Sequence, residues 1–188
     1  MNFFIAAGHY PEKAGACHEG FCEYDEAARW VEVIKNYLVR EHKTVGENLF
    51  IVTPNVVALK TSFVNCRCSK QDIFVEVHFN SAVMSHHTLI EGCETLYYPT
   101  SVRGKKVAQT LQDKMVAAYA LKDRGIKEGF YQQKKSKGII YTLRGTKCTT
   151  VILEPEFIQH KEKIQSMRES VCKAIAQGLL ELEASLAD

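Results

Sequence analysis

Short runs of consecutive apolar residues recur along the whole chain. Each run is four to seven residues long, which is the length of a β-strand rather than of a helix. The apolar side chains occupy consecutive rather than alternating positions, a pattern typical of strands that are covered on both faces of a sheet. The runs are residues 3–6, 48–52, 72–77, 92–98, 139–143 and 150–153.

Between these runs, three segments carry apolar residues at the helical spacing of three and four. Such a stripe predicts an amphipathic helix whose apolar face packs against a core. The stripes are formed by Ala27, Val31, Ile34 and Leu38, by Val107, Leu111, Met115 and Ala118, and by Ile164, Met167, Val171, Ile175, Leu179 and Leu182. Strands that alternate with helices predict an α/β fold with three layers (α/β/α) and a mostly parallel central sheet of about six strands. The sequence contains no repeat or linker, so we expect residues 1–188 to form a single domain.

Charge and hydropathy exclude several classes of partner. The chain has 24 Lys and Arg residues against 22 Asp and Glu residues, for a net charge of +2, which leaves no electrostatic footprint for nucleic acid. No apolar run approaches the ~20 residues of a membrane span. The first predicted strand begins at residue 3, which leaves no room for a signal peptide. We therefore expect synthesis in the cytoplasm.

The cysteines are seven in number and scattered along the chain. An odd, irregular set favours free thiols in a reducing compartment over a disulfide framework. Cys66 and Cys68 are separated by one residue, which is too close for the usual pair of structural zinc thiolates.

Three of the predicted strands lead directly into residues with metal-binding or acid–base chemistry. Residues 3–6 lead through Gly8 to His9, residues 72–77 lead to His78, and residues 150–153 lead to Glu154. The carboxyl ends of strands in an open α/β sheet are where ligands gather. A carboxylate at the end of a strongly apolar run is a poor core residue, and near a metal it could act as general base. The pattern predicts a metal site.

Two histidines and one glutamate are a usual ligand set for catalytic zinc. Three carboxylates follow His9 and could complete the set: Glu12, Glu19 and Glu23. Glu23 is favoured because it begins the first helical stripe, where a negative charge also interacts well with the helix dipole. Glu12 forms a His-x-x-Glu spacing with His9, as in another class of zinc peptidase, and Glu19 lies in a loop.

Seven segments, in the same order, resemble motifs of the Amidase_3 family of zinc-dependent N-acetylmuramoyl-L-alanine amidases. Residues 7–9 are similar to the opening Gly-His motif, and residues 23–25 to the Glu-x-Asp that begins the first helix. Residues 75–80, preceded by Asn65, resemble the Ile-Ser-Ile-His-x-Asn block, and residues 153–158 resemble the block with the catalytic glutamate. The remaining segments are residues 92–98, 124–127 and 143–144. Glu156 departs from the family pattern, because a glycine is usual there.

This resemblance implies an enzyme with one Zn²⁺ per chain, held by His9, Glu23 and His78. It implies hydrolysis of the amide between the lactyl group of N-acetylmuramic acid and L-alanine of the peptidoglycan stem peptide, with Glu154 as general base and then general acid. Arg144 is either an anchor for a stem-peptide carboxylate or a surface residue. Asn80 either orients His78 or contacts the substrate.

The spacing between motifs bears on regulation and biological role. Only residues 81–91 separate the second histidine motif from the next strand, too few for the plugging helix of some family members, so we expect an open site. A minimal, unregulated wall hydrolase resembles a phage or prophage endolysin, or an enzyme of a sporulating mother cell. Three alternatives are a carboxypeptidase-like enzyme that uses Glu12, an inactive peptidoglycan-binding module, and a structural α/β domain without ligand.

Overall fold

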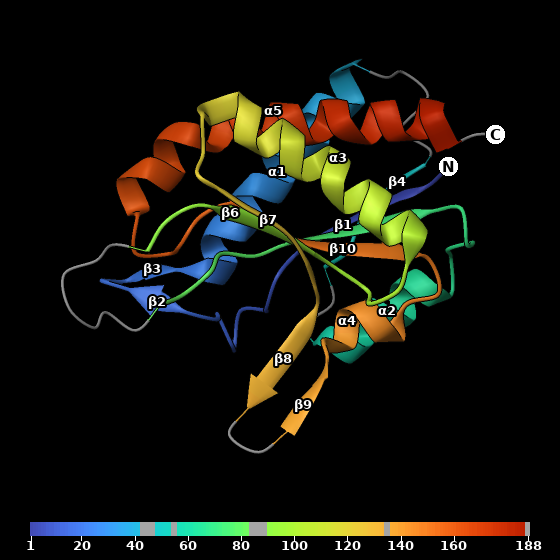
Figure 1. Cartoon of the computed structure of the whole chain (residues 1–188), viewed down its shortest axis with the longest axis horizontal. Helices are drawn as coiled ribbons and strands as arrows, with labels where there is room; N and C mark the ends of the chain where they lie inside the picture. Colours follow the sequence, from blue (N-terminus) through green and yellow to red (C-terminus); the bar gives the residue numbers. More distant parts are fainter. Residues whose placement is uncertain (42–47, 54–55, 83–89, 134–135, 187–188) are drawn as a thin grey trace.

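The computed structural model describes residues 1–41, 48–53, 56–82, 90–133 and 136–186. At its centre lies a six-stranded sheet (Figure 1). The strand order is β4-β1-β5-β10-β6-β7. Neighbouring strands are parallel except β10 and β6, which pair antiparallel. The strands are β1 (Phe3–Ala7), β4 (Leu49–Ile51), β5 (Ile73–Val77), β6 (Cys93–Tyr97), β7 (Asp123–Glu128) and β10 (Thr149–Glu154).

The three strands that precede the candidate site residues are neighbours in this sheet. In the register, Ala7 of β1 lies opposite Val77 of β5, and Leu153 of β10 lies opposite Val77 on the other side. Because these three strands are parallel and end at the same level, the residues that follow them meet at one edge. The fold thus brings His9, His78 and Glu154 into one region.

Helices cover both faces of the sheet and complete three layers. On one face, α1 (Glu23–Glu41), α3 (Val102–Tyr119) and α5 (Lys161–Leu186) pack against one another and against the sheet (Figure 1). All three predicted stripes lie on these helices, and residues such as Trp30, Leu111 and Ile175 are fully buried in the main core. On the other face, α2 (Val57–Asn65) and α4 (Tyr141–Gly145) cover a smaller core around Phe4 and Phe74. The predicted three-layer α/β/α class is confirmed.

One predicted strand was wrong and another strand was not predicted. Ile139 ends the hairpin strand β9 (Ser136–Ile139), which pairs with β8 (Phe130–Gln133). Residues 141–143 of the run belong to the short helix α4, and Ile140 lies between the two elements. A short apolar run does not distinguish a strand from one buried helical turn. The sixth strand of the sheet is β7, whose sequence is mostly polar because it lies at the sheet edge, where charged residues discourage further pairing.

Within the described part of the chain, no helix combines the length and the apolar content needed to cross a membrane.

Candidate active site

His9, Glu23 and His78 form a compact cluster of potential metal ligands. Nε2 of His9 lies 3.0 Å from one carboxylate oxygen of Glu23, and Nδ1 of His78 lies 2.8 Å from the other. One ligand atom from each residue can be chosen so that all lie within 4.8 Å of one another. Two imidazole nitrogens and one carboxylate oxygen are a donor set of catalytic zinc sites. The geometry and chemistry of this cluster fit such an ion.

The backbone around the cluster leaves no room for extra side-chain atoms. A Cβ added to Gly8 would lie 2.4–2.5 Å from the ring of His78. Gly15 has a φ of +78°, and its Cβ would lie 2.4 Å from the Glu23 carboxylate and 2.5 Å from the His9 ring. His9 itself has a φ of +58°, which is uncommon for a residue with a side chain and is often found at functional sites.

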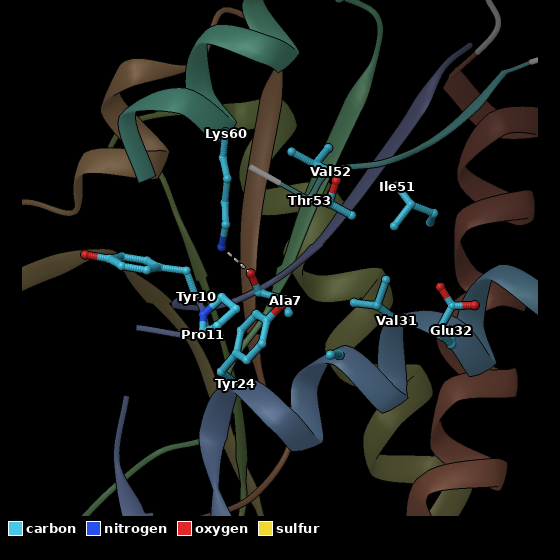
Figure 2. A pocket seen from close by; sticks show the side chains of 11 residues that line it. Ala7, Tyr10, Pro11, Tyr24, Val31, Glu32, Ile51, Val52, Thr53 and Lys60 are labelled. Carbon is cyan, nitrogen blue, oxygen red and sulfur yellow. Dashed lines mark hydrogen bonds between the residues drawn. The ribbon is translucent and has the colours of Figure 1, made fainter. Parts of the chain in front are cut away.

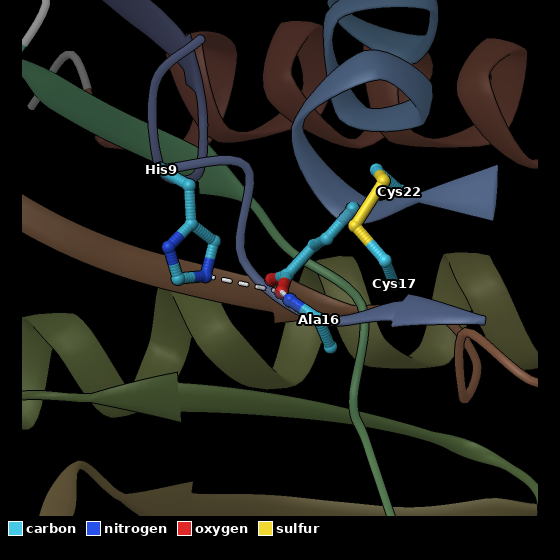
Figure 3. The surroundings of a disulfide bond; sticks show 5 residues. His9, Ala16, Cys17 and Cys22 are labelled. Atoms are coloured by element: carbon cyan, nitrogen blue, oxygen red, sulfur yellow. Dashed lines mark hydrogen bonds and ion pairs between the residues drawn. A yellow bond between two sulfur atoms is a disulfide. The ribbon is translucent and has the colours of Figure 1, made fainter. Parts of the chain in front are cut away.

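A disulfide-closed hairpin holds Glu23 at the start of α1. Strand β2 (Cys17–His18) pairs with β3 (Phe21–Cys22), and Cys17 and Cys22 are bonded to each other (Figure 3). The backbone N–H of Ala16 donates to the Glu23 carboxylate at 3.1 Å. The expectation of free thiols throughout was therefore wrong for this pair. Scattered positions in the sequence do not reveal that a two-residue turn places two of the cysteines opposite each other.

Burial and close pairing shift the pKa values of the cluster. Burial by itself would raise the pKa of Glu23, but the hydrogen bonds with His78 and His9 hold it well below its usual range. Burial would lower the pKa of His78, but Glu23 and Glu76 raise it to about 10. In the metal-free protein the imidazole of His78 is therefore positively charged at neutral pH. A cation bound at this site would displace the proton on Nδ1.

Glu154 ends β10 beside this cluster and faces a cavity of about 300 Å³ that His9 and His78 also line. One of its carboxylate oxygens is buried and has no hydrogen-bond partner among the described residues. Burial raises its pKa to about 8; His78 opposes this shift, and the negative charges of Glu23 and Glu94 add to it. Perturbed carboxyl groups of this kind in a cavity are typical of functional sites.

A second carboxylate, Glu94, lies directly opposite Glu154 on the neighbouring strand β6. It pairs with Arg124 at 2.7 Å and with Lys127 from the edge strand β7. Burial opposes ionisation of Glu94, but these two cations keep its pKa below the usual value. An ionised Glu94 thus remains beside Glu154 and adds to the rise in the pKa of Glu154.

Neither of the two candidate substrate-binding residues is among the residues that line the cavity. Arg144, on α4, stands over the ring of Tyr141 and lines a separate pocket with Lys70 and Lys147. Asn80 follows β5, and its backbone bonds to Glu156 and Ile158 tie this loop to the segment after β10. The Asn80 side chain lies next to Glu94.

Glu156, the departure from the family pattern, is fully buried behind this loop. One of its carboxylate oxygens accepts hydrogen bonds from the backbone N–H groups of Gly92 and Phe157, and the other pairs with Lys163 of α5 at 2.6 Å. The added carboxylate therefore links the end of β10 to α5 and to the segment before β6.

Sequence reasoning missed a buried ion pair next to the histidines. Lys60 of α2 and Glu76 of β5 are each 2% exposed, and their charged atoms lie 3.4 Å apart. The signal for Glu76 was a charged residue in the middle of an apolar strand run, since such residues are rarely fully buried without a partner. Lys60 carried no comparable signal, because its neighbours in the sequence are ordinary helix residues.

The other carboxylates considered as ligands are exposed in the structure. Glu12 lies in the turn between Tyr10 and Lys13, and Glu19 occupies the tip of the hairpin. Of the segment expected to leave the site open, residues 83–89 lie outside the described residues, so that expectation stays a prediction.

Comparison with known proteins identifies the family. The model of the Amidase_3 family, described as N-acetylmuramoyl-L-alanine amidase, matches residues 3–181. The chain therefore belongs to this family, and it is an enzyme of the N-acetylmuramoyl-L-alanine amidase class, which acts on peptidoglycan.

Individual relatives share about a quarter or less of their aligned residues with this chain. The uncharacterized protein YqiI of Bacillus subtilis (strain 168) is 25% identical over 193 aligned positions, which cover 94% of this chain and 82% of YqiI. An N-acetylmuramoyl-L-alanine amidase from Clostridium difficile 630 superposes with a TM-score of 0.80 at 21% identity, covering 98% of this chain and 97% of that one. The catalytic domain of the CD27L endolysin, which targets Clostridia difficile, superposes with a TM-score of 0.71 at 24% identity. The superposition covers 96% of this chain and 97% of that domain.

Proposed function

We propose that this chain, acting as one catalytic domain over residues 1–188, hydrolyses the amide between the lactyl group of N-acetylmuramic acid and L-alanine of the stem peptide, in a zinc-dependent reaction. The observation that carries the proposal is the buried, unpartnered carboxylate oxygen of Glu154, which lies among the described residues at a cavity shared with His9 and His78. A buried oxygen without a partner is costly for folding alone, so its retention favours a chemical role.

His9, Glu23 and His78 would hold one Zn²⁺, which when bound acts as a Lewis acid and lowers the pKa of water. Glu154 faces the cavity from the adjacent strand end and would accept the proton of the attacking water. The same carboxyl would then donate that proton to the leaving amine of L-alanine. A pKa raised to about 8 suits this exchange, because efficient acid–base groups titrate near the working pH.

The apolar part of the cavity lining can position the glycan or the peptide. Leu96, Ile140 and Ile152 contribute apolar side chains to the cavity, and Tyr141 contributes an aromatic ring. Such a surface excludes water from one side of the scissile bond, which strengthens the electrostatic interactions on the other side. Arg144 and Asn80 remain proposed contacts for more distant parts of the substrate.

The test is digestion of purified sacculi, with mass spectrometry of the released fragments and zinc quantified in each sample. Wild-type protein should release stem peptides that begin with L-alanine and leave the glycan strands intact. Glu154→Gln keeps the shape of the side chain and should lose about 10²- to 10⁴-fold in rate, the usual contribution of a general base, while zinc stays bound. Glu12→Ala should keep both zinc and rate.

Three outcomes would reject parts of this proposal. Intact sacculi with zinc bound would point to another amide substrate or to a binding role. Loss of rate in Glu12→Ala would favour the carboxypeptidase-like alternative. Absence of stoichiometric zinc from all samples would remove the metal site itself.

We further propose a bacteriolytic role of the endolysin type. The likeness of the fold to the catalytic domain of the CD27L endolysin supports this role. Addition of purified protein to suspensions of living and of chloroform-treated bacteria should lower the turbidity, and an unchanged turbidity in both would contradict it.

A further inference from the structure

A buried Lys–Glu pair contacts the imidazole of one candidate histidine ligand, His78, and the backbone of the other, His9. One carboxylate oxygen of Glu76 lies 3.4 Å from Nζ of Lys60, and the other lies 3.4 Å from Nε2 of His78. Nδ1 of the same imidazole faces Glu23. The ring of His78 is thus held between two carboxylates, one at each nitrogen.

Lys60 extends from α2 across the end of β1 and contacts the backbone of the other histidine. Its ammonium group donates to the carbonyl oxygen of Ala7 (Figure 2). It also donates, at 2.6 Å, to the carbonyl oxygen of His9. These two carbonyls flank Gly8, where the chain leaves the strand and enters the left-handed conformation of His9. A charged donor on both carbonyls holds this uncommon backbone turn in place.

A pair in this position is unusual for a purely structural element. Both side chains are almost completely buried, and a buried ion pair contributes little net stability compared with apolar residues of the same volume. In the Ile-Ser-Ile-His block that residues 75–80 resemble, the position of Glu76 is a serine, so the strand itself does not require a carboxylate. In metal sites, however, the second nitrogen of a ligating histidine usually donates to a carboxylate, which fixes the tautomer and raises the basicity of the ligand.

We propose that Glu76 and Lys60 are positioning residues of the metal site. Glu76 accepts the Nε2–H of His78 and so leaves Nδ1 free to bind a cation beside Glu23 and His9. Lys60 compensates the charge of Glu76 and fixes the backbone that presents His9. This inference rests on the metal site of the proposed function.

The test compares zinc affinity, measured by competition with a chromogenic chelator, in wild-type protein and in Glu76→Gln. Loss of a carboxylate partner of a ligating histidine typically weakens metal binding 10- to 100-fold, and we expect a loss in this range. The matched control is Glu26→Gln, which neutralises a buried carboxylate that bonds to Trp30 and Arg168 instead of to a ligand. The control should bind zinc as the wild type does, because Glu26 bonds to none of the three candidate ligands.

A second readout reports the tautomer directly. In long-range ¹H–¹⁵N spectra of the zinc-loaded wild type, the imidazole assigned to His78 should show a proton on Nε2 that is shifted downfield by its hydrogen bond to Glu76. The shift should move upfield in Glu76→Gln. If removal of one charge prevents folding, the double variant Lys60→Met/Glu76→Gln removes both charges and should show the same loss of affinity.

The assignment would be overturned if a folded Glu76 variant had the zinc affinity and the Nε2 proton shift of the wild type. It would also be overturned if the wild type bound no zinc. Failure of the proposed amidase reaction is a separate result, because it appears in the sacculus digest while the affinity measurement needs no substrate. A zinc-binding protein that releases no stem peptides would leave the Glu76 assignment standing if the variant binds zinc more weakly.

Discussion

Gly15 offers a clean test of how tightly the ligand cluster is packed. Its φ of +78° and the φ of +77° at Gly20 are nearly identical, and both glycines belong to the segment between His9 and Glu23. Alanine at either position must adopt a left-handed conformation, which costs about 1–2 kcal/mol of stability. The two sites therefore have the same backbone penalty.

The surroundings of the two glycines differ completely. A Cβ at Gly20 would have no heavy atom within 4 Å among the described residues, whereas a Cβ at Gly15 would lie 2.4 Å from Glu23 and 2.5 Å from His9. Ordinary contacts of a Cβ begin near 3.4 Å, so the ligands must move by roughly 1 Å, a displacement that can cost about 10²-fold in rate.

We expect Gly15→Ala to lose about 100-fold in kcat/KM on sacculi, by the same reasoning, and 10- to 100-fold in zinc affinity. Gly20→Ala should lose only the backbone term of about 1–2 kcal/mol in urea unfolding, with rate and zinc affinity close to wild type. Dye release from labelled sacculi, chelator competition and urea unfolding measure the three quantities. Equal rates and equal zinc affinities in the two variants would refute the idea that Gly15 is needed to make room for the ligands.

Three further predictions concern protonation, the disulfide and the substrate. The pKa of His78 rises from 6.5 to about 10 on folding, so its contribution to stability is fully present below pH 6.5 and is lost as the pH rises through 10. Urea unfolding of chelator-treated protein should show a loss of at least about 1 kcal/mol between pH 6 and pH 10, equivalent to one pKa unit, and an unchanged value would contradict it. Thiol titration of the denatured, unreduced protein should find five reactive cysteines, because two of the seven are paired. Seven reactive thiols in that titration would exclude the disulfide. Replacement of Cys17 and Cys22 by serine should lower the free energy of unfolding by about 2 kcal/mol, because the disulfide closes only a short loop. If Arg144 anchors a stem-peptide carboxylate, Arg144→Ala should raise KM for soluble muramyl peptides about 10-fold at unchanged kcat, in line with the 1.5–3 kcal/mol of a charged hydrogen bond, and an unchanged KM would make it a surface residue.

The local pattern of apolar and polar residues was sufficient to predict the fold class and the strand ends that lead into the candidate site. Runs such as residues 3–6 and 150–153 became central strands, and the stripe from Ala27 to Leu38 became the buried face of α1. These features could be predicted because strand and helix periodicities are local, and because a polar residue directly after a buried strand must emerge at the sheet edge. His9, His78 and Glu154 are of this kind.

Other features depend on contacts between distant parts of the chain, and only the tertiary structure decided them. The residues alone left Glu12, Glu19 and Glu23 open as ligands, and the distances to both histidines single out Glu23. The partnership of Lys60 with Glu76 joins a helix on one layer to a strand in the next. Periodicity records which face of an element is buried, but it carries no information on which side chain of another element lies opposite. His9, His78 and Glu154 thus followed from strand ends, while Glu23 and the residues that hold the proposed ligands in place followed from packing between layers.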